Sequence, residues 1–261
     1  MQSSVPWWRL RQVALVAADL DAAEAELGEL LGLDVCYRDP GVATFGLRNA
    51  LWAIGDTFLE VVSPTQGDTT AGLYLERRGG DAGYMVILQT DDLDGARRRV
   101  EAHDVRIVYT AEGPGVTGLH LHPRDAGGAI LSLDRCDDPA EWLWAGPTWR
   151  DHAAIDRVAD LVAVDVAAEE PDALADRWAG LVGLPLRRPR ELRLGTGAIR
   201  FVEAGERGEG VEALDLRATD RSLAGTSRRI CGTELRFVCP PSAPAWISPL
   251  RPSKPCGGTV T

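Results

Sequence analysis

The sequence predicts an α+β fold of tandem β-α-β-β-β modules, arranged as two module pairs of which the second is degenerate. Residues 13–23 (VALVAADLDAA) and 86–96 (VILQTDDLDGA) are identical at six of eleven positions, at an offset of 73 residues. Each copy passes from an apolar run, typical of a buried strand, through Asp-Leu-Asp into a helical pattern. A fainter copy of this order is present at residues 158–187. The chain therefore repeats one structural unit.

In the first module the helix signals are clear. Asp19 is placed to cap its N-terminus, apolar residues recur at helical spacing from Leu20 to Leu30, and Gly32 suits a left-handed C-terminal cap. Short strands are expected after this helix, separated by Asp, Pro and Gly residues, at 35–37, 43–47 and 57–62.

The second module follows the same order. Leu93, Ala96 and Val100 share one face of its helix, and strands are expected at 105–109, 118–122 and 129–133. Between the two modules, residues 70–85 form either a lid over them or a simple crossover.

The second pair is less regular. A strand at 159–166 leads to a helix that starts at Pro171 and stops at Gly183. Strands at 191–194 and 198–203 complete this third module, and the fourth has strands at 210–219 and 234–238 with little room for a helix. The expected domains are a first pair at 1–136 (modules about 10–64 and 84–135), a Trp-rich linker at 137–152, a degenerate pair at 153–238 and a disordered Pro-rich tail at 239–261.

Three motifs carry a family resemblance: the DLDAA helix start, the closing strand FLEVVSP and the turn HPRDAGG at 122–128. Paired modules with these motifs resemble the vicinal oxygen chelate superfamily, which includes glyoxalases, extradiol dioxygenases, methylmalonyl-CoA epimerases and bleomycin-resistance proteins. The resemblance implies the glyoxalase/bleomycin-resistance/dioxygenase-type fold. It does not settle the chemistry, because one fold hosts many activities.

Composition excludes several other classes of protein. The formal net charge of -11 argues against nucleic acid or an anionic membrane as partner. No apolar stretch is long enough to span a bilayer, so a cytoplasmic protein is expected. Five cysteines without a CxxC pair fit reduced thiols, and HExxH, Walker A, dinucleotide-binding and GxSxG motifs are all missing.

The resemblance also implies where a metal would bind, because metal-dependent members draw ligands from the first and last strands of each module. Those positions hold Gln12 and Met85 on the first strands, and Glu60 and Ser132 on the closing strands. A thioether is too soft for a hard divalent ion, and a serine hydroxyl is a weak ligand. No cofactor is therefore expected; if a divalent metal is present, Gln12 and Glu60 are its candidate ligands.

The same positions should line a small-molecule cup. Glu60 lies between apolar neighbours, where desolvation would raise its pKa into the range of a general base; alternatively, it is an inherited residue held by Gln12 without chemistry. His122 is the candidate acid-base partner, although it could instead anchor the turn. The remaining expected ligand-binding residues are Gln12, Met85, Ser132, His120 and Tyr84.

Three hypotheses follow. The first is a metal-independent isomerase or lyase acting on a small carbonyl compound, with Glu60 as base and His122 or Gln12 polarising the substrate. The second is a non-catalytic protein of bleomycin-resistance type that sequesters an aromatic or cationic ligand. The third is a metal-dependent dioxygenase or lyase. The expected partner is a small molecule, and the chain could act as a monomer or a homodimer.

Overall fold

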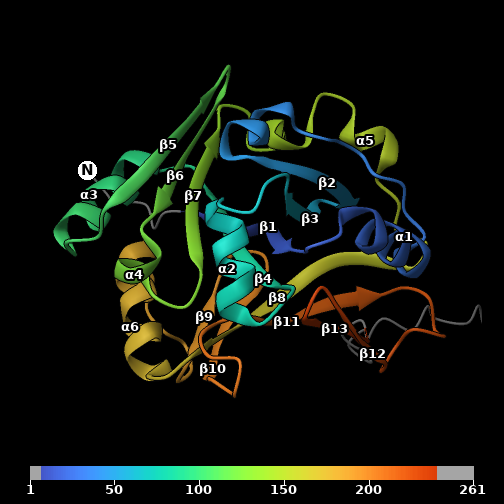
Figure 1. Cartoon of the computed structure of the whole chain (residues 1–261). Coiled ribbons are helices and arrows are strands. Elements are labelled where there is room, and N and C mark those ends of the chain that lie inside the picture. Colours follow the sequence, from blue (N-terminus) through green and yellow to red (C-terminus); the bar gives the residue numbers. More distant parts are fainter. Residues whose placement is uncertain (1–6, 240–261) are drawn as a thin grey trace, which may run out of the picture.

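The computed structural model describes residues 7–239 and contains two mixed β-sheets. The first sheet has seven strands in the order β2-β3-β1-β4-β7-β6-β5, and the second has six in the order β12-β13-β11-β8-β10-β9. In Figure 1 the first sheet lies above the second. This arrangement confirms the predicted α+β fold of tandem modules.

The first sheet contains two copies of the unit. One copy comprises β1 (Trp8–Val16), α1 (Leu20–Leu31), β2 (Leu47–Ile54) and β3 (Thr57–Pro64). The other comprises β4 (Ala82–Thr90), α3 (Leu93–Ala102), β5 (Ile107–Gly113), β6 (Val116–Leu121) and β7 (Ile130–Cys136). β1 and β4 pair antiparallel at the centre of the sheet, so the two copies meet along their first strands.

The predicted helix caps are present in α1. Asp19 accepts hydrogen bonds from the amides of Asp21 and Ala22, and Gly32 ends the helix with φ of 65°. In the second copy, Asp92 accepts from the amide of Gly95 at the start of α3. The Asp-Leu-Asp motif therefore starts a helix in both copies, as its repetition indicates.

Two predicted strands of the first copy are wrong. Residues 43–47 fall mostly in a 3-10 helix, η1 (Pro40–Phe45), because Asp39 caps it, Pro40 occupies its first turn and Gly46 ends it in the left-handed conformation. Residues 35–37 contribute only an isolated bridge between Tyr37 and Leu51. The next strand, β2, begins at Leu47, the last residue of the strand predicted at 43–47.

The second sheet contains the degenerate copies. One comprises β8 (Val158–Ala168), α6 (Pro171–Val182), β9 (Glu191–Arg193) and β10 (Ala198–Glu203). The other comprises β11 (Gly210–Ala218), β12 (Ser227–Ile230) and β13 (Thr233–Val238), with no helix between β11 and β12. The missing helix agrees with the prediction, whereas β12 was not predicted.

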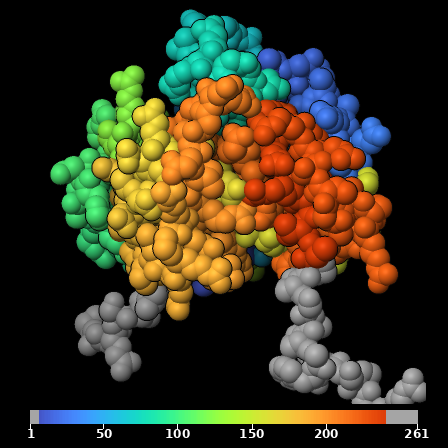
Figure 2. All heavy atoms as spheres, turned by 90° about the horizontal axis from the view of Figure 1, so that it is seen from below, coloured from blue at the N-terminus to red at the C-terminus, as the bar shows by residue number. Residues whose placement is uncertain are grey.

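The two sheets share one apolar core. One face of each sheet, together with α1, α3 and α6, contributes side chains to it. Gly83 on β4 lies so close to β11 that an added Cβ would meet the Cβ of Val211 at 2.3 Å, so glycine is required for this approach. Residues of the second half, coloured yellow to red, cover much of the lower face of the molecule in Figure 2.

Three short connections complete the described chain. α2 (Thr70–Arg78) joins the two copies of the first sheet, and α4 (Pro123–Ala126) lies between β6 and β7. The Trp-rich linker folds onto the first sheet and contains η2 (Leu143–Ala145) and α5 (Trp149–His152). No helix among residues 7–239 is long and apolar enough to cross a membrane. The predicted tail at 239–261 lies outside the described residues, apart from Cys239.

Candidate functional site

The other face of the first sheet encloses a cavity of about 670 Å³. Its walls come from β1 to β7, η1, α2 and the linker. The polar and ionisable side chains that line it are Gln12, Asp39, Asn49, Glu60, Thr70, Tyr84, Tyr109, Glu112, His120, Asp134 and Trp144. A cavity of this size with a few convergent polar groups is typical of a small-molecule site.

Glu60 on β3 is held by two amide side chains. Gln12 Nε2 donates to Glu60 Oε2 at 2.8 Å, and Asn49 Nδ2 donates to Glu60 Oε1 at 2.7 Å. Burial raises the pKa of Glu60, and the two hydrogen bonds oppose that rise because they favour the carboxylate. Glu60 is therefore a desolvated carboxylate whose basicity is increased, which is the property that a general base requires.

Both amides are locked in the orientation that presents NH₂ to Glu60. Gln12 Oε1 accepts from the indole Nε1 of Trp142 at 2.7 Å, and Asn49 Oδ1 accepts from the backbone amide of Asp39 at 2.9 Å. An indole and a backbone N–H can only donate, so each fixes the amide oxygen on its own side. A flip of either amide would leave two donors facing each other.

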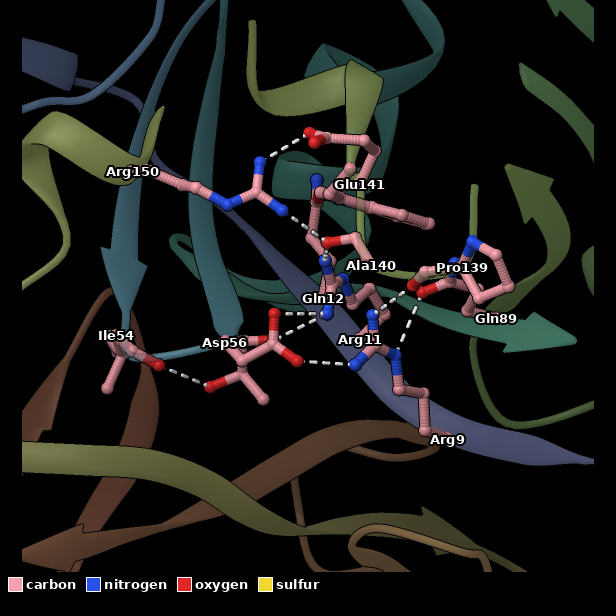
Figure 3. A network of polar contacts seen from close by, with 12 residues as sticks. Arg9, Arg11, Gln12, Ile54, Asp56, Gln89, Pro139, Ala140, Glu141 and Arg150 are labelled. Atoms are coloured by element: carbon pink, nitrogen blue, oxygen red, sulfur yellow. Dashed lines mark hydrogen bonds and ion pairs between the residues drawn. The ribbon is translucent and has the colours of Figure 1, made fainter. Parts of the chain in front are cut away.

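The linker that carries Trp142 is anchored to β1 by two arginines (Figure 3). Arg9 donates to the carbonyl of Pro139 at 2.8 Å, and Arg11 donates to the carbonyl of Ala140 at 3.4 Å. Both guanidinium groups also pair with Asp56 in the turn between β2 and β3. This network fixes the linker to the strand that bears Gln12.

Arg11 is fully buried beneath the linker. Its guanidinium lies over the rings of Phe58, Trp142 and Trp149, with centroid distances of 5.2, 5.4 and 5.8 Å. Burial, reinforced by the neighbouring charge of Arg9, lowers the pKa of Arg11 to about 10. At neutral pH it remains a cation, stabilised by three aromatic faces and by Asp56.

A second polar group lies on the other half of the sheet. Asp134 on β7 accepts from Trp144 Nε1 at 2.7 Å and from the hydroxyl of Ser132. Its carboxyl covers Gly118, where an added Cβ would meet Asp134 Oδ2 at 2.5 Å. Burial raises the pKa of Asp134 to about 7, so this group changes charge near neutral pH.

Aromatic side chains also border the cavity. The rings of Phe45 and Tyr109 meet edge to face at 5.1 Å, and Tyr109 contacts the ring of His120 at 5.4 Å. Phe45 and Tyr109 are 45% and 42% exposed, so they lie at the solvent boundary. Burial lowers the pKa of His120 to about 4, which leaves its imidazole neutral at pH 7.

The cavity includes five of the seven side chains singled out in the sequence. Gln12, Glu60, Tyr84, Met85 and His120 all line it. Burial raises the pKa of Tyr84 to about 12, so its phenol stays neutral.

Ser132 and His122 are placed differently. Ser132 is fully buried, is not among the lining residues and donates to Asp134. His122 also lies outside the lining because β6 ends at Leu121 and the chain turns into α4, where His122 Nδ1 accepts from the amide of Arg124 at 3.2 Å. The position of His122 fits the turn-anchor alternative better than contact with a ligand in this cavity.

Sequence reasoning missed four functional candidates. Asp134 carried a usable signal, because strand alternation places it on the same face as Ser132, two residues earlier. Asn49 was missed because β2 was predicted several residues too early. Trp142 and Trp144 were assigned to the linker, and nothing in their local sequence indicates that their N–H groups reach Gln12 and Asp134.

The donor set does not fit a divalent metal. The amide oxygen of Gln12 is taken by Trp142, both oxygens of Glu60 accept amide N–H groups, and Met85 offers only a soft thioether. Among residues 7–239 no group of three or more His, Cys, Asp or Glu side chains could hold a metal ion.

Fold and site together define a small-molecule-binding protein of the vicinal oxygen chelate type. The family model for the glyoxalase-like domain matches residues 13–182, more than half of the chain, and the chain belongs to this family.

Two relatives extend this result. Mitochondrial methylmalonyl-CoA epimerase of Mus musculus is 25% identical over 140 residues, covering 51% of this chain and 78% of the relative. Ethylmalonyl-CoA/methylmalonyl-CoA epimerase of Cereibacter sphaeroides is 27% identical over 132 residues, covering 49% of this chain and 97% of the relative.

Among solved structures, a hypothetical protein from Staphylococcus aureus superimposes with a TM-score of 0.67. It is 12% identical, and the match covers 89% of this chain and 99% of that structure. At that identity the match supports the fold across both sheets.

Proposed function

We propose that this protein is an isomerase that removes a proton from the carbon next to a carbonyl group, with Glu60 as the base and without a metal. The observation that carries this proposal is the environment of Glu60, a buried carboxylate in a cavity wall, with two amide groups locked as its donors. Two relatives named as epimerases favour isomerase over lyase chemistry.

The amides supply the second requirement of this chemistry. Each NH₂ group has two N–H bonds, and one from Gln12 and one from Asn49 go to Glu60. The second N–H of either group can donate to the carbonyl oxygen of a ligand, where negative charge develops when the proton leaves. Base and oxyanion donors would then lie side by side. With an α-hydroxy carbonyl ligand, Glu60 would return the proton to the adjacent carbon of the enediolate and so complete the isomerisation, whereas return to the original carbon on the same face regenerates the starting compound.

Deuterium incorporation tests this proposal. The full chain is incubated in D₂O with a panel of α-substituted ketones and acyl thioesters that includes methylmalonyl-CoA, and NMR follows the proton next to the carbonyl. We expect exchange with at least one compound and its loss in Glu60→Gln. Glu203→Gln is the matched control, because Glu203 ends the closing strand β10 of the second sheet and is exposed.

Binding without turnover is the second candidate function, and the exposed aromatic pair Phe45 and Tyr109 at the boundary of the cavity favours it. Such a protein would bind members of the panel and exchange none of their protons, in the native chain as in Glu60→Gln. That result would contradict the isomerase proposal and support sequestration.

A further inference from the structure

The ionisable groups that line the cavity are nearly all acidic. Four carboxyl groups line it, from Asp39, Glu60, Glu112 and Asp134, and none of the lining residues is Lys or Arg. His120 adds no positive charge because its pKa is lowered to about 4. None of the four carboxyl groups takes part in an ion pair within residues 7–239.

This absence of cations has a consequence for the ligand. An acyl-CoA with a malonyl-type group carries a carboxylate and several phosphate charges, and in this cavity its acyl end would meet only neutral or negative side chains. Desolvating an anion without a cationic partner is costly. The named substrates of the two epimerase relatives are therefore a poor match for this wall.

A positively charged ligand is a better match. Asp134 offers a buried carboxyl, and the aromatic side chains of Tyr109 and Trp144 lie in the same wall. Aromatic faces attract organic cations, and a buried carboxylate without a charged partner gains most from one. The overall formal charge of -11 adds long-range attraction for a cation.

The strand order sets the scale of such a ligand. Glu60 on β3 and Asp134 on β7 are separated by β1 and β4, so their strands lie roughly 14 Å apart, and the register sets the two residues four positions apart along the strands. Gln12, which donates to Glu60, lies nearer, because it is two strands from β7 and its row ends at Ser132, two positions from Asp134. A ligand with its amine at Asp134 therefore reaches Glu60 by way of the Gln12 amide.

We propose that the ligand of this cavity is a carbonyl compound that also carries a cationic amine, with the amine at Asp134 and the carbonyl group at Glu60 and Gln12. The carbonyl half of this inference rests on the proposed function. The cationic half rests on the charges of the wall, and it holds for a sequestering protein as well as for an isomerase.

Three matched probes test the charge preference. They are acetophenones with a para substituent that is cationic (dimethylaminomethyl), neutral (isobutyl) or anionic (carboxylate), and isothermal titration calorimetry on the full chain measures their affinities. We expect the cation to bind at least about tenfold more tightly than the anion at pH 8, with the neutral probe between them. Its affinity should rise from pH 6 to pH 8 as Asp134 ionises.

Two variants locate the preference. Asp134→Asn should reduce the advantage of the cation to within about threefold and remove the dependence on pH. Glu112→Gln, an exposed change that spares the buried hydrogen bonds, should reduce the advantage by a smaller factor, and Glu203→Gln should leave it unchanged. The variants thereby separate a local effect of the wall from the overall charge.

Several outcomes would overturn the inference. They are equal or tighter binding of the anionic probe, an unchanged preference in both Asp134→Asn and Glu112→Gln, or binding of none of the probes at millimolar concentration. Because calorimetry needs no turnover, these results are independent of deuterium exchange. Cation binding without proton exchange would remove the isomerase proposal and leave the ligand class standing.

Discussion

The two sheets are built from the same unit, but their faces away from the shared core differ in how their charged side chains are paired. The first sheet has a cavity in which Glu60 meets only neutral donors. The second sheet carries two aspartates, Asp165 on β8 and Asp215 on β11, which are bound by two arginines, Arg200 on β10 and Arg236 on β13. All four contacts are between 2.6 and 2.8 Å.

This difference shows how a shared framework can keep a site or close it. A closed ring of two carboxylates and two guanidinium groups satisfies its own charges and leaves no ionic group for a ligand. Carboxyl groups held by amides and indoles are satisfied as hydrogen-bond acceptors, but their charge has no counterpart. We infer that the first sheet retains the working site and that the second supports it structurally.

The largest expected effect comes from breaking the charge ring. Asp165→Asn leaves Arg200 and Arg236 without one shared carboxylate. Removing one partner of a buried ion pair typically costs about 3–5 kcal/mol, and we expect about 3 kcal/mol here because the arginine side chains are 33% and 31% exposed. Urea unfolding should show this loss. Asp172→Asn, which breaks an exposed pair with Arg190, should cost no more than about 1 kcal/mol. Similar values for both variants would contradict a structural role for the ring.

The second effect is a dependence of stability on pH that originates in the first sheet. Asp134 has a folded-state pKa raised to about 7, so the folded protein binds a proton that the unfolded chain has already released between about pH 4 and 7. This contribution to stability is present at acidic pH and is lost as pH rises through 7. In Asp134→Asn, the change in the free energy of unfolding across that window should be smaller by about 2 kcal/mol or more.

Urea midpoints at pH 5, 6, 7 and 8 measure this slope. The contribution of Asp134 is the difference between the native chain and the variant, which removes the titration of all other groups. A slope that is the same in both proteins would show that Asp134 titrates in its ordinary range.

The third effect concerns the linker. Trp142→Phe keeps an aromatic ring but removes the N–H that fixes the amide of Gln12, so the amide can turn its oxygen toward Glu60 and raise the pKa of that carboxyl further. We expect about a tenfold loss of proton exchange at pH 7, the equivalent of one hydrogen bond. The midpoint of the pH profile of proton exchange should shift to higher pH.

Trp149→Phe is the matched control for this change. Trp149 is also buried in the linker and packs against Phe58, but its indole N–H has no acceptor among the described residues. A pH profile that shifts equally in both variants would show that packing, and not the hydrogen bond to Gln12, determines the result.

The smallest effect is expected at the boundary of the cavity. Phe45→Ala removes the edge-to-face contact with Tyr109. Such a contact contributes about 1 kcal/mol in addition to the burial of apolar area, and its loss should weaken ligand binding by about fivefold. Leu143→Ala, another exposed apolar residue but outside the lining, is the control. Equal affinities for both variants would exclude Phe45 from the binding surface.

Much of the fold could be predicted because the repeat fixes the order of elements. The Asp19 and Gly32 caps and the Pro171 and Gly183 limits of α6 are local signals that the structure confirms. The errors arose where local signals competed, as in η1, where the Asp-Pro-Gly turn outweighs the apolar residues that follow it.

The site could be predicted only in part. The family resemblance implies that the first and closing strands of a module contribute to one site, which brings Gln12 and Glu60 together, and their hydrogen bond was anticipated as one of the two interpretations of Glu60. The indole that fixes Gln12 comes from 130 residues further along the chain, and the second donor to Glu60, Asn49, is fixed by a backbone amide. No sequence pattern encodes such contacts. The same holds for the charge ring, whose members lie on four strands.

The titration of Glu60 itself tests most directly whether this carboxyl is suited to act as a base. ¹³C NMR of protein labelled at the glutamate carboxyl carbon, assigned with Glu60→Gln, follows the group from pH 3 to pH 9. We predict a pKa above the usual range for glutamate, and a further rise in Trp142→Phe but not in Trp149→Phe. A pKa at or below the ordinary value would show that the two amides outweigh burial, and Glu60 would then be a structural acceptor and not a base.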